Sequence, residues 1–162
     1  LLDALNGSHF DTYCDASLKA VLSSGFFGFL RPGEFTTQKF NPARNLTLSD
    51  VSFVSGVAIL HLKRSKGDRL NRGVIIRYFP VKNHLCPVAN LRRYLKLRSI
   101  LFFQVSSPLT PLFLMLNGKA LSRTQFITRL RNLLSSLGLD PSCYSGHSLR
   151  IGTPPPQHRE AS

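Results

Sequence analysis

The stretch Gly28-Phe29-Leu30-Arg31-Pro32-Gly33-Glu34 marks the point where one predicted helix ends and another begins. The preceding segment, residues 11–28, carries apolar residues at helical spacing. Pro32 disfavours helical dihedral angles at Arg31, yet it suits the first position of a new short helix that has Glu34 in its first turn. The sequence therefore predicts that Arg31 lies at a fixed corner between two helices.

Two interpretations of Arg31 stay open from these residues alone. It is either a surface residue at a helix end, or a half-buried residue that is held by Glu34 and grips an anion. Arginine is better suited than lysine to the second role, because its planar guanidinium can bind two phosphate oxygens at once.

Beyond this corner the chain predicts a small antiparallel sheet. The segments 51–53, 57–62 and 74–79 are short and rich in β-branched residues. Between the second and third lies Lys63-Arg64-Ser65-Lys66-Gly67-Asp68-Arg69, in which Lys66-Gly67-Asp68 favours a turn. We expect a hairpin with a basic loop, where Lys66 is a proton donor, a phosphate contact or a solvated charge.

Three further helices are predicted in the second half of the chain. Pro87 begins the first, and its basic residues are expected on the faces away from the core: Arg92, Arg93, Lys96 and Arg98. Ser122 and Gln125 have the spacing of a helix cap, and Gly138 is expected to end that helix. The last helix begins near Ser145. The expected fold class is thus α+β, mainly helical with a small antiparallel sheet.

The composition is that of a folded, strongly basic domain. The chain has 162 residues, 43% of them hydrophobic, which suits one domain with its own core. Its formal charge of +13 favours nucleic acid as a partner, with a membrane surface or an acidic protein as alternatives. No apolar run approaches the ~20 residues of a membrane helix. Cys14, Cys86 and Cys143 are far apart, which favours free thiols in a reducing, intracellular setting.

His147 and Arg150 are three residues apart at the predicted start of the last helix, so their side chains project on one face. The backbone N–H groups and the helix dipole favour an anion at the same end. The alternative is a capping histidine beside a solvated arginine. Tyr144 precedes the helix, where a tyrosine is more often packed than reactive.

Taken in order, these motifs resemble the catalytic domain of tyrosine recombinases, the enzymes that break and rejoin DNA. The resemblance covers roughly residues 1–153, and is greatest for the recombinases of DIRS-type and crypton-like mobile elements of eukaryotes. It is carried by Leu30-Arg31 with Glu34, by Lys66 after a strand, and by Ser145-Gly146-His147-Ser148-Leu149-Arg150.

The resemblance implies a transesterification without metal or cofactor, in which a tyrosine attacks a DNA phosphodiester. By position, Arg31 and Arg150 would hold the non-bridging oxygens. Lys66 would protonate the leaving 5′-oxygen, and His147 would assist proton transfer. Glu34 would support Arg31.

The resemblance also implies duplex DNA as a partner, other recombinase protomers as a further class of partner, and the nucleus as the place of action. Four basic residues around the hairpin are the expected DNA contacts: Lys63, Arg64, Arg69 and Arg72. Arg31→Ala is expected to weaken phosphate binding more than Arg98→Ala does.

The sequence departs from the family after Arg150, where the family continues with a helix and then the nucleophilic tyrosine. Here Pro154-Pro155-Pro156 cannot continue a helix, and no tyrosine follows. We expect a partial catalytic domain over residues 1–153 and an aberrant tail over 154–162. The chain alone is expected not to cleave DNA, unless a neighbouring protomer supplies the tyrosine. The alternatives are a non-catalytic DNA-binding remnant and, with less support, a basic RNA-binding domain.

Overall fold

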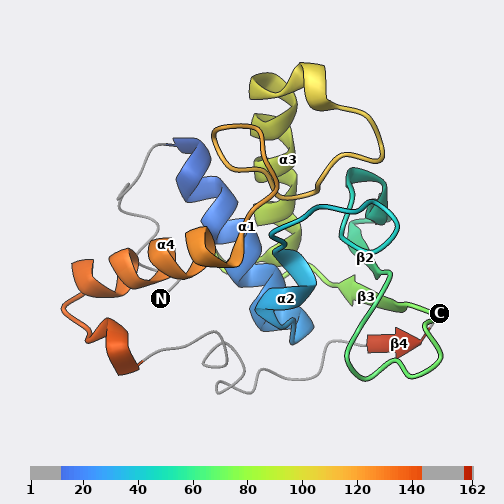
Figure 1. Cartoon of the computed structure of the whole chain (residues 1–162), viewed down its shortest axis with the longest axis horizontal. Coiled ribbons are helices and arrows are strands. Elements are labelled where there is room, and N and C mark those ends of the chain that lie inside the picture. The colour runs from blue at the N-terminus through green and yellow to red at the C-terminus, as the bar shows by residue number, and fades with distance from the viewer. Residues whose placement is uncertain (1–11, 144–158, 162) are drawn as a thin grey trace.

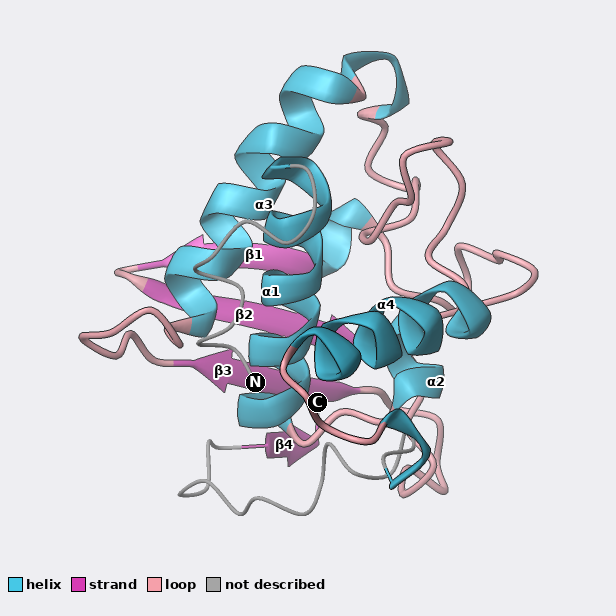
Figure 2. Cartoon of the chain, turned by 90° about the vertical axis from the view of Figure 1, so that its left-hand side faces the viewer, coloured by secondary structure: helices cyan, strands magenta, loops and turns pink. Residues whose placement is uncertain are grey.

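The computed structural model describes residues 12–143 and 159–161. Helices α1 (Thr12–Gly28) and α3 (Pro87–Leu101) lie side by side over one face of an antiparallel sheet (Figure 2). Helix α4 (Arg123–Ser136) lies on the other side of α1 from the sheet (Figure 1). This arrangement confirms the mainly helical α+β fold class expected from the sequence.

Helix α1 is the centre of the core. Its predicted apolar residues are buried, and so are small polar residues on its other faces, among them Ser17, Ser23 and Ser24. A helix that is covered on nearly all sides has little freedom to tilt or shift. Its last residue, Gly28, therefore provides a fixed starting point for the corner that follows.

The sheet consists of β1 (Val51–Val54), β2 (Val57–Leu62), β3 (Val74–Tyr78) and β4 (Arg159–Ala161), paired in that order and antiparallel throughout. The β2–β3 pairing is the hairpin that the sequence predicts. Alternate residues of these two strands face the helices and are buried, as expected for a sheet with one covered face.

Strand β4 comes from the segment that the sequence predicts to be an aberrant tail. Its three residues pair with β3, from Val74 opposite Ala161 to Ile76 opposite Arg159. The predicted domain end near Thr153 lies outside the described residues and stays a prediction.

The predicted helix boundaries are confirmed where local signals set them. Helix α2 (Pro32–Phe35) begins at its proline. The Ser122 hydroxyl accepts a hydrogen bond from the Gln125 N–H (3.1 Å) and caps α4. Gly138 follows α4 with a φ of 73°, the left-handed conformation in which glycine is favoured.

The placement of Arg98 was predicted wrongly. Arg92, Arg93 and Lys96 are exposed as expected, whereas Arg98 is only 1% exposed. Its guanidinium donates to the carbonyls of Leu112 (3.2 Å), Val105 (3.2 Å) and Pro111 (2.6 Å) and to the Thr110 hydroxyl (3.0 Å). Arg98 therefore holds the 105–112 segment onto α3, and its removal is no neutral control for phosphate binding.

Three of the four tyrosines lie in the core. Tyr13, Tyr78 and Tyr94 are at most 4% exposed, and each phenol donates to a main-chain carbonyl 2.8–2.9 Å away. Burial raises the pKa of Tyr13 and of Tyr94 above the ordinary value for tyrosine. These three side chains are structural, and Tyr144 lies outside the described residues.

Cys14 and Cys86 are buried free thiols. Within residues 12–143 and 159–161, no helix has both the length and the apolar character needed to cross a membrane. The same residues contain no cluster of three or more His, Cys, Asp or Glu side chains arranged to hold a metal ion.

Candidate functional site

The corner between α1 and α2 directs Arg31. After Gly28 the chain turns at Phe29, whose φ of 53° is uncommon for a residue with a side chain. The turn is held by a hydrogen bond from the Leu30 N–H to the Gly25 carbonyl (2.9 Å) and by full burial of Leu30. Arg31 itself is extended (φ −84°, ψ 149°), as Pro32 requires. The direction of the Arg31 side chain is therefore set by the packing of Leu30 and by Pro32.

The same corner is fitted tightly against the sheet. A Cβ placed on Gly28 would lie 2.4 Å from the Tyr78 Oη, far inside van der Waals contact. The Tyr78 hydroxyl also donates to the Ser24 carbonyl (2.9 Å), which anchors the last turn of α1 to β3. Only glycine permits this close approach. Gly28 therefore lets the end of α1, and with it the Arg31 corner, pack directly against β3, the strand that follows the basic loop.

Glu34 joins the corner to the loop between β2 and β3. One carboxylate oxygen accepts a hydrogen bond from the Arg31 N–H (2.8 Å), and the other accepts one from the Ser65 hydroxyl (2.9 Å). The residue expected to support Arg31 thus holds its main chain. It also links Arg31 to the basic loop, a role that the sequence does not suggest.

The basic loop, residues 63–73, is folded around Asp68. The Asp68 N–H donates to the Ser65 carbonyl (2.9 Å), and its carboxylate accepts a hydrogen bond from the Gly73 N–H (2.7 Å). Desolvation acts to raise the pKa of Asp68, but backbone N–H groups of Gly73, Arg72 and Leu70, aided by the Arg72 charge, lower it below its ordinary value. The carboxylate is therefore used to order the loop.

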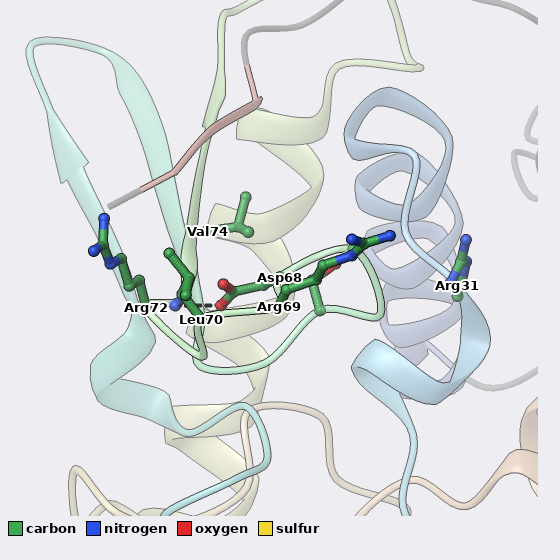
Figure 3. Close-up of a pocket in the computed structure, with 9 residues that line it drawn as sticks. Arg31, Asp68, Arg69, Leu70, Arg72 and Val74 are labelled. Atoms are coloured by element: carbon green, nitrogen blue, oxygen red, sulfur yellow. Dashed lines mark hydrogen bonds between the residues drawn. The ribbon is translucent and has the colours of Figure 1, made fainter.

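A pocket of about 600 Å³ lies between the corner and this loop, with Arg31 on one side and residues of the 65–74 segment on the other (Figure 3). Arg69 extends from the loop toward Arg31, whereas Arg72 points to the opposite side (Figure 3). Three arginine residues thus line the pocket, and of the two on the loop it is Arg69 whose guanidinium approaches Arg31. The carboxylate that lines the pocket, Asp68, already accepts main-chain hydrogen bonds.

One nitrogen of Arg31 lacks a partner. Its Nη1 is buried, and among the described residues nothing accepts a hydrogen bond from it. A buried donor of a charged group that stays unpaired costs free energy, so this nitrogen calls for an acceptor from water, an ion or a ligand. The pocket is therefore suited to an anion with several acceptor oxygens.

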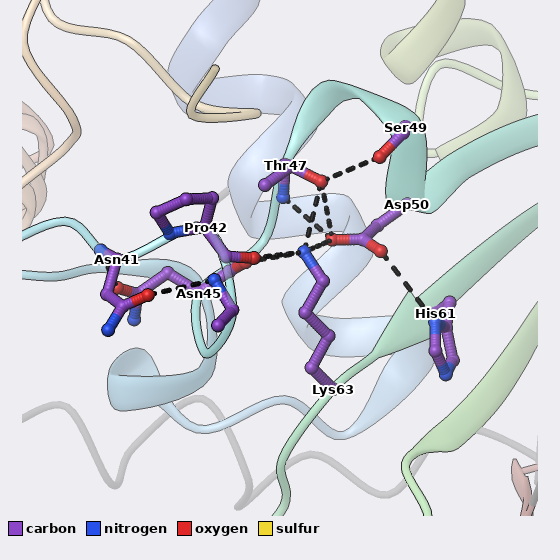
Figure 4. Close-up of polar contacts among 9 residues, drawn as sticks. Asn41, Pro42, Asn45, Thr47, Ser49, Asp50, His61 and Lys63 are labelled. Carbon is purple, nitrogen blue, oxygen red and sulfur yellow. Dashed lines mark hydrogen bonds and ion pairs between the residues drawn. The ribbon is translucent and has the colours of Figure 1, made fainter. Parts of the chain in front are cut away.

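The other predicted site residues are placed as follows. Arg64 and Lys66 are exposed on the basic loop, and Lys66 lies between two residues that line the pocket. The ammonium of Lys63 is instead engaged within the protein, 2.7 Å from the Asp50 carboxylate (Figure 4). His147 and Arg150 lie outside the described residues, so their approach to Arg31 and Lys66 stays a prediction.

Sequence reasoning missed Asp50 and the ordering role of Asp68. A signal for Asp50 was present, because Thr47 and Asp50 have the spacing of a helix cap and the Thr47 N–H does donate to that carboxylate (2.8 Å). For Asp68 the signal was its place in a predicted turn, where aspartate often accepts backbone hydrogen bonds.

The solved structures that share this fold include two complexes of the XerH recombinase. The XerH site-specific recombinase bound to difH substrate, in a pre-cleavage complex, has a TM-score of 0.58 and 19% identity over 92% of this chain. A post-cleavage complex of XerH with palindromic difH substrate gives 0.58 and 20% over 92%. The chain spans only 37% and 36% of the length of those recombinase chains.

At this level of identity the similarity is one of fold, and it confirms for the described part of the chain the fold of a tyrosine recombinase domain. The sequence matches no protein-family model and no curated protein. The likeness to DIRS-type and crypton-like recombinases stays a prediction.

Proposed function

We propose that this chain is the DNA-binding catalytic domain of a tyrosine recombinase, and that the Arg31 pocket holds one phosphodiester of duplex DNA. The observation that carries the proposal is Arg31, which lines a pocket together with Arg69 and Arg72 and whose buried Nη1 has no acceptor among the described residues. A phosphodiester supplies the missing acceptor and the opposite charge. The fold supports the same ligand class, because the XerH structures that share it are complexes with difH substrate.

Arg31 is suited to stabilise charge as well as to bind it. Its main chain is fixed by Pro32 and by the hydrogen bond to Glu34, which limits how far its donors must move when negative charge grows on the non-bridging oxygens. A preorganised donor of this kind is typically worth about 3–4 kcal/mol in a transition state. In the proposed mechanism Arg150 shares this task, Lys66 protonates the leaving 5′-oxygen and His147 assists proton transfer.

The 162-residue chain is proposed not to attack DNA by itself. Tyr13, Tyr78 and Tyr94 are buried with their phenols bonded to the main chain, and no tyrosine follows Arg150. A nucleophile supplied by another protomer would be one route to activity. A suicide DNA substrate tests this, because a covalent protein–DNA product with this chain alone would overturn the proposed inactivity.

DNA binding through Arg31 is tested by measuring duplex affinity over a series of salt concentrations. Arg31→Ala is expected to weaken binding about 10- to 100-fold, as for the loss of hydrogen bonds to a charged group. It should also reduce the slope of log K against log salt by about 0.9, the value for one lost phosphate contact.

The matched control is Arg131→Ala, which removes one exposed positive charge from α4, on the other side of α1 from the sheet. Its effect on affinity should be small. Equal losses for the two variants would show that bulk charge alone, and no defined phosphate site, drives binding.

Two alternatives have their own outcomes. A non-catalytic remnant would bind duplex DNA with the same dependence on Arg31, yet form no covalent product even beside an active protomer. A basic RNA-binding domain would prefer structured RNA over duplex DNA in direct competition.

The proposal extends to the origin and location of the protein. The motif resemblance supports descent from a eukaryotic mobile element and action in the nucleus, where its DNA would be found. A tagged chain that stayed in the cytoplasm of a eukaryotic cell would count against that location.

A further inference from the structure

The ammonium of Lys63 is surrounded by protein acceptors. Its Nζ lies 2.7 Å from the Asp50 Oδ2, 2.8 Å from the Pro42 carbonyl, and 3.1 Å from both the Asn45 carbonyl and the Thr47 hydroxyl (Figure 4). A lysine ammonium has three N–H donors and no acceptor. Four acceptors within hydrogen-bond distance use all of these donors, which leaves none for a phosphate.

The partner of Lys63 is a buried carboxylate. The Asp50 side chain is 6% exposed, and its Oδ2 also accepts hydrogen bonds from the Thr47 N–H (2.8 Å) and hydroxyl (2.9 Å). Its other oxygen lies 3.7 Å from the Nδ1 of His61. A carboxylate so enclosed is costly without a cation, so the Asp50–Lys63 pair is part of the folded structure.

Because of where Lys63 lies in the chain, the Asp50–Lys63 pair affects the loop that lines the pocket. Lys63 directly follows β2 and is the first residue of the basic loop. The pair thus attaches the start of the loop to the 42–50 segment. Two residues later, Ser65 attaches the loop to Glu34 of the Arg31 corner (2.9 Å). The loop that carries Arg69 is therefore fixed at its base by two separate side-chain contacts.

We propose that Lys63 is a positioning residue: paired with Asp50, it holds the basic loop in the orientation that places Arg69 opposite Arg31, and it does not contact DNA. The proposal rests on the proposed function, because the loop is taken to hold a phosphodiester. It replaces the expectation, drawn from sequence alone, that Lys63 is itself a DNA contact.

Asp50→Asn distinguishes a phosphate-contact role of Lys63 from a positioning role, because the two roles predict opposite changes in DNA affinity. Asparagine keeps an oxygen for the Thr47 hydrogen bonds but removes the charge that holds Lys63. If Lys63 were a phosphate contact, losing a nearby negative charge would leave DNA affinity unchanged or raise it. If Lys63 is a positioning residue, affinity falls, by roughly 2- to 30-fold for a mutation that acts through another element.

The matched control is Asp140→Asn, which removes the same charge from an exposed position after α4. Its DNA affinity should equal that of the wild type or exceed it slightly. Asp50→Asn binding at least as tightly as this control would overturn the proposal.

Lys63→Arg provides a second test that preserves net charge and, if Asp50→Asn fails to fold, replaces the first. Arginine binds phosphate at least as well as lysine, but its planar fork cannot occupy the compact four-acceptor site. We expect weaker DNA binding by Lys63→Arg. Wild-type affinity in this variant would identify Lys63 as a direct contact.

A measurement made without DNA tests the positioning role of Lys63 independently of the proposed DNA binding. Amide hydrogen exchange over residues 63–73 should be faster in Asp50→Asn than in the wild type or in Asp140→Asn. If the wild-type chain does not bind DNA, the proposed function fails while this measurement still tests the role of Lys63. Unchanged exchange over residues 63–73 would overturn the positioning role.

Discussion

Gly28→Ala tests whether the Arg31 corner is as tightly fitted as its geometry indicates. The added methyl group would lie 2.4 Å from the Oη, 3.1 Å from the Cζ and 3.3 Å from the Cε1 of Tyr78. Tyr78 has no exposed surface and donates its hydroxyl proton to the Ser24 carbonyl, so it has nowhere to move without losing that bond. Either the ring or the end of α1 must shift.

The expected change in the free energy of unfolding follows from three contributions. Overpacking of a core costs about 1–3 kcal/mol, and loss of the Tyr78 hydrogen bond costs about 0.5–1.5 kcal/mol. The higher helix propensity of alanine returns up to about 1 kcal/mol. The net expectation is a destabilisation of about 2 kcal/mol, which lowers Tm by about 4–8 °C in a domain of this size.

The assay is thermal and urea unfolding of Gly28→Ala beside Gly33→Ala. A Cβ at Gly33 meets nothing within 4 Å, so that substitution should be neutral or slightly stabilising. Tyr78→Phe combined with Gly28→Ala should lose less than the sum of the two single changes, because the phenylalanine removes the atom in closest contact. A Gly28→Ala chain as stable as the wild type would refute the close approach of α1 to β3.

Two further outcomes follow from polar groups in the fold. Arg98→Met should lower the free energy of unfolding by about 3 kcal/mol or more, because several buried acceptors lose their donor at about 1–3 kcal/mol each. Urea unfolding measures this change. A loss of less than about 1 kcal/mol would contradict the structural role of Arg98. The pKa of Asp68 in the folded chain lies below its ordinary value of 3.8. The stabilisation of the loop by this carboxylate is therefore present above pH 3.8 and is lost as the pH falls through the lower folded pKa. The protection of the Gly73 amide against hydrogen exchange should therefore fall in strong acid. In Asp68→Asn this protection should be low at every pH above that range. A wild-type protection that does not depend on pH would contradict the role of Asp68.

The parts of the fold that could be predicted from sequence are those set by neighbouring residues. Pro32 determines where α2 begins, Ser122 caps α4, and Gly138 ends it, because each acts on its own backbone or on residues a few positions away. The corner at Arg31 was predictable for the same reason. That the Arg31 corner lies next to the basic loop depends also on the order of the strands, and the short segments rich in β-branched residues predicted the β2–β3 hairpin that carries this loop.

The error on Arg98 and the omitted partner of Lys63 concern charges whose partners lie elsewhere in the chain. Arg98 and Lys63 have the local context of solvated basic residues, and lysine and arginine are rarely buried unless paired. Their partners, the carbonyls of residues 105–112 and the Asp50 carboxylate, are brought near only by the tertiary fold. A sequence pattern records the charge but not the acceptors that surround it.

The central claim is that Arg31 binds a DNA backbone phosphate, and the most direct test is a structure of the chain with a short duplex. We expect a phosphate oxygen within about 2.7–3.2 Å of the Arg31 guanidinium, with Arg69 on the other side of the same phosphodiester. DNA bound elsewhere on the basic surface, with the Arg31 pocket unoccupied, would contradict it.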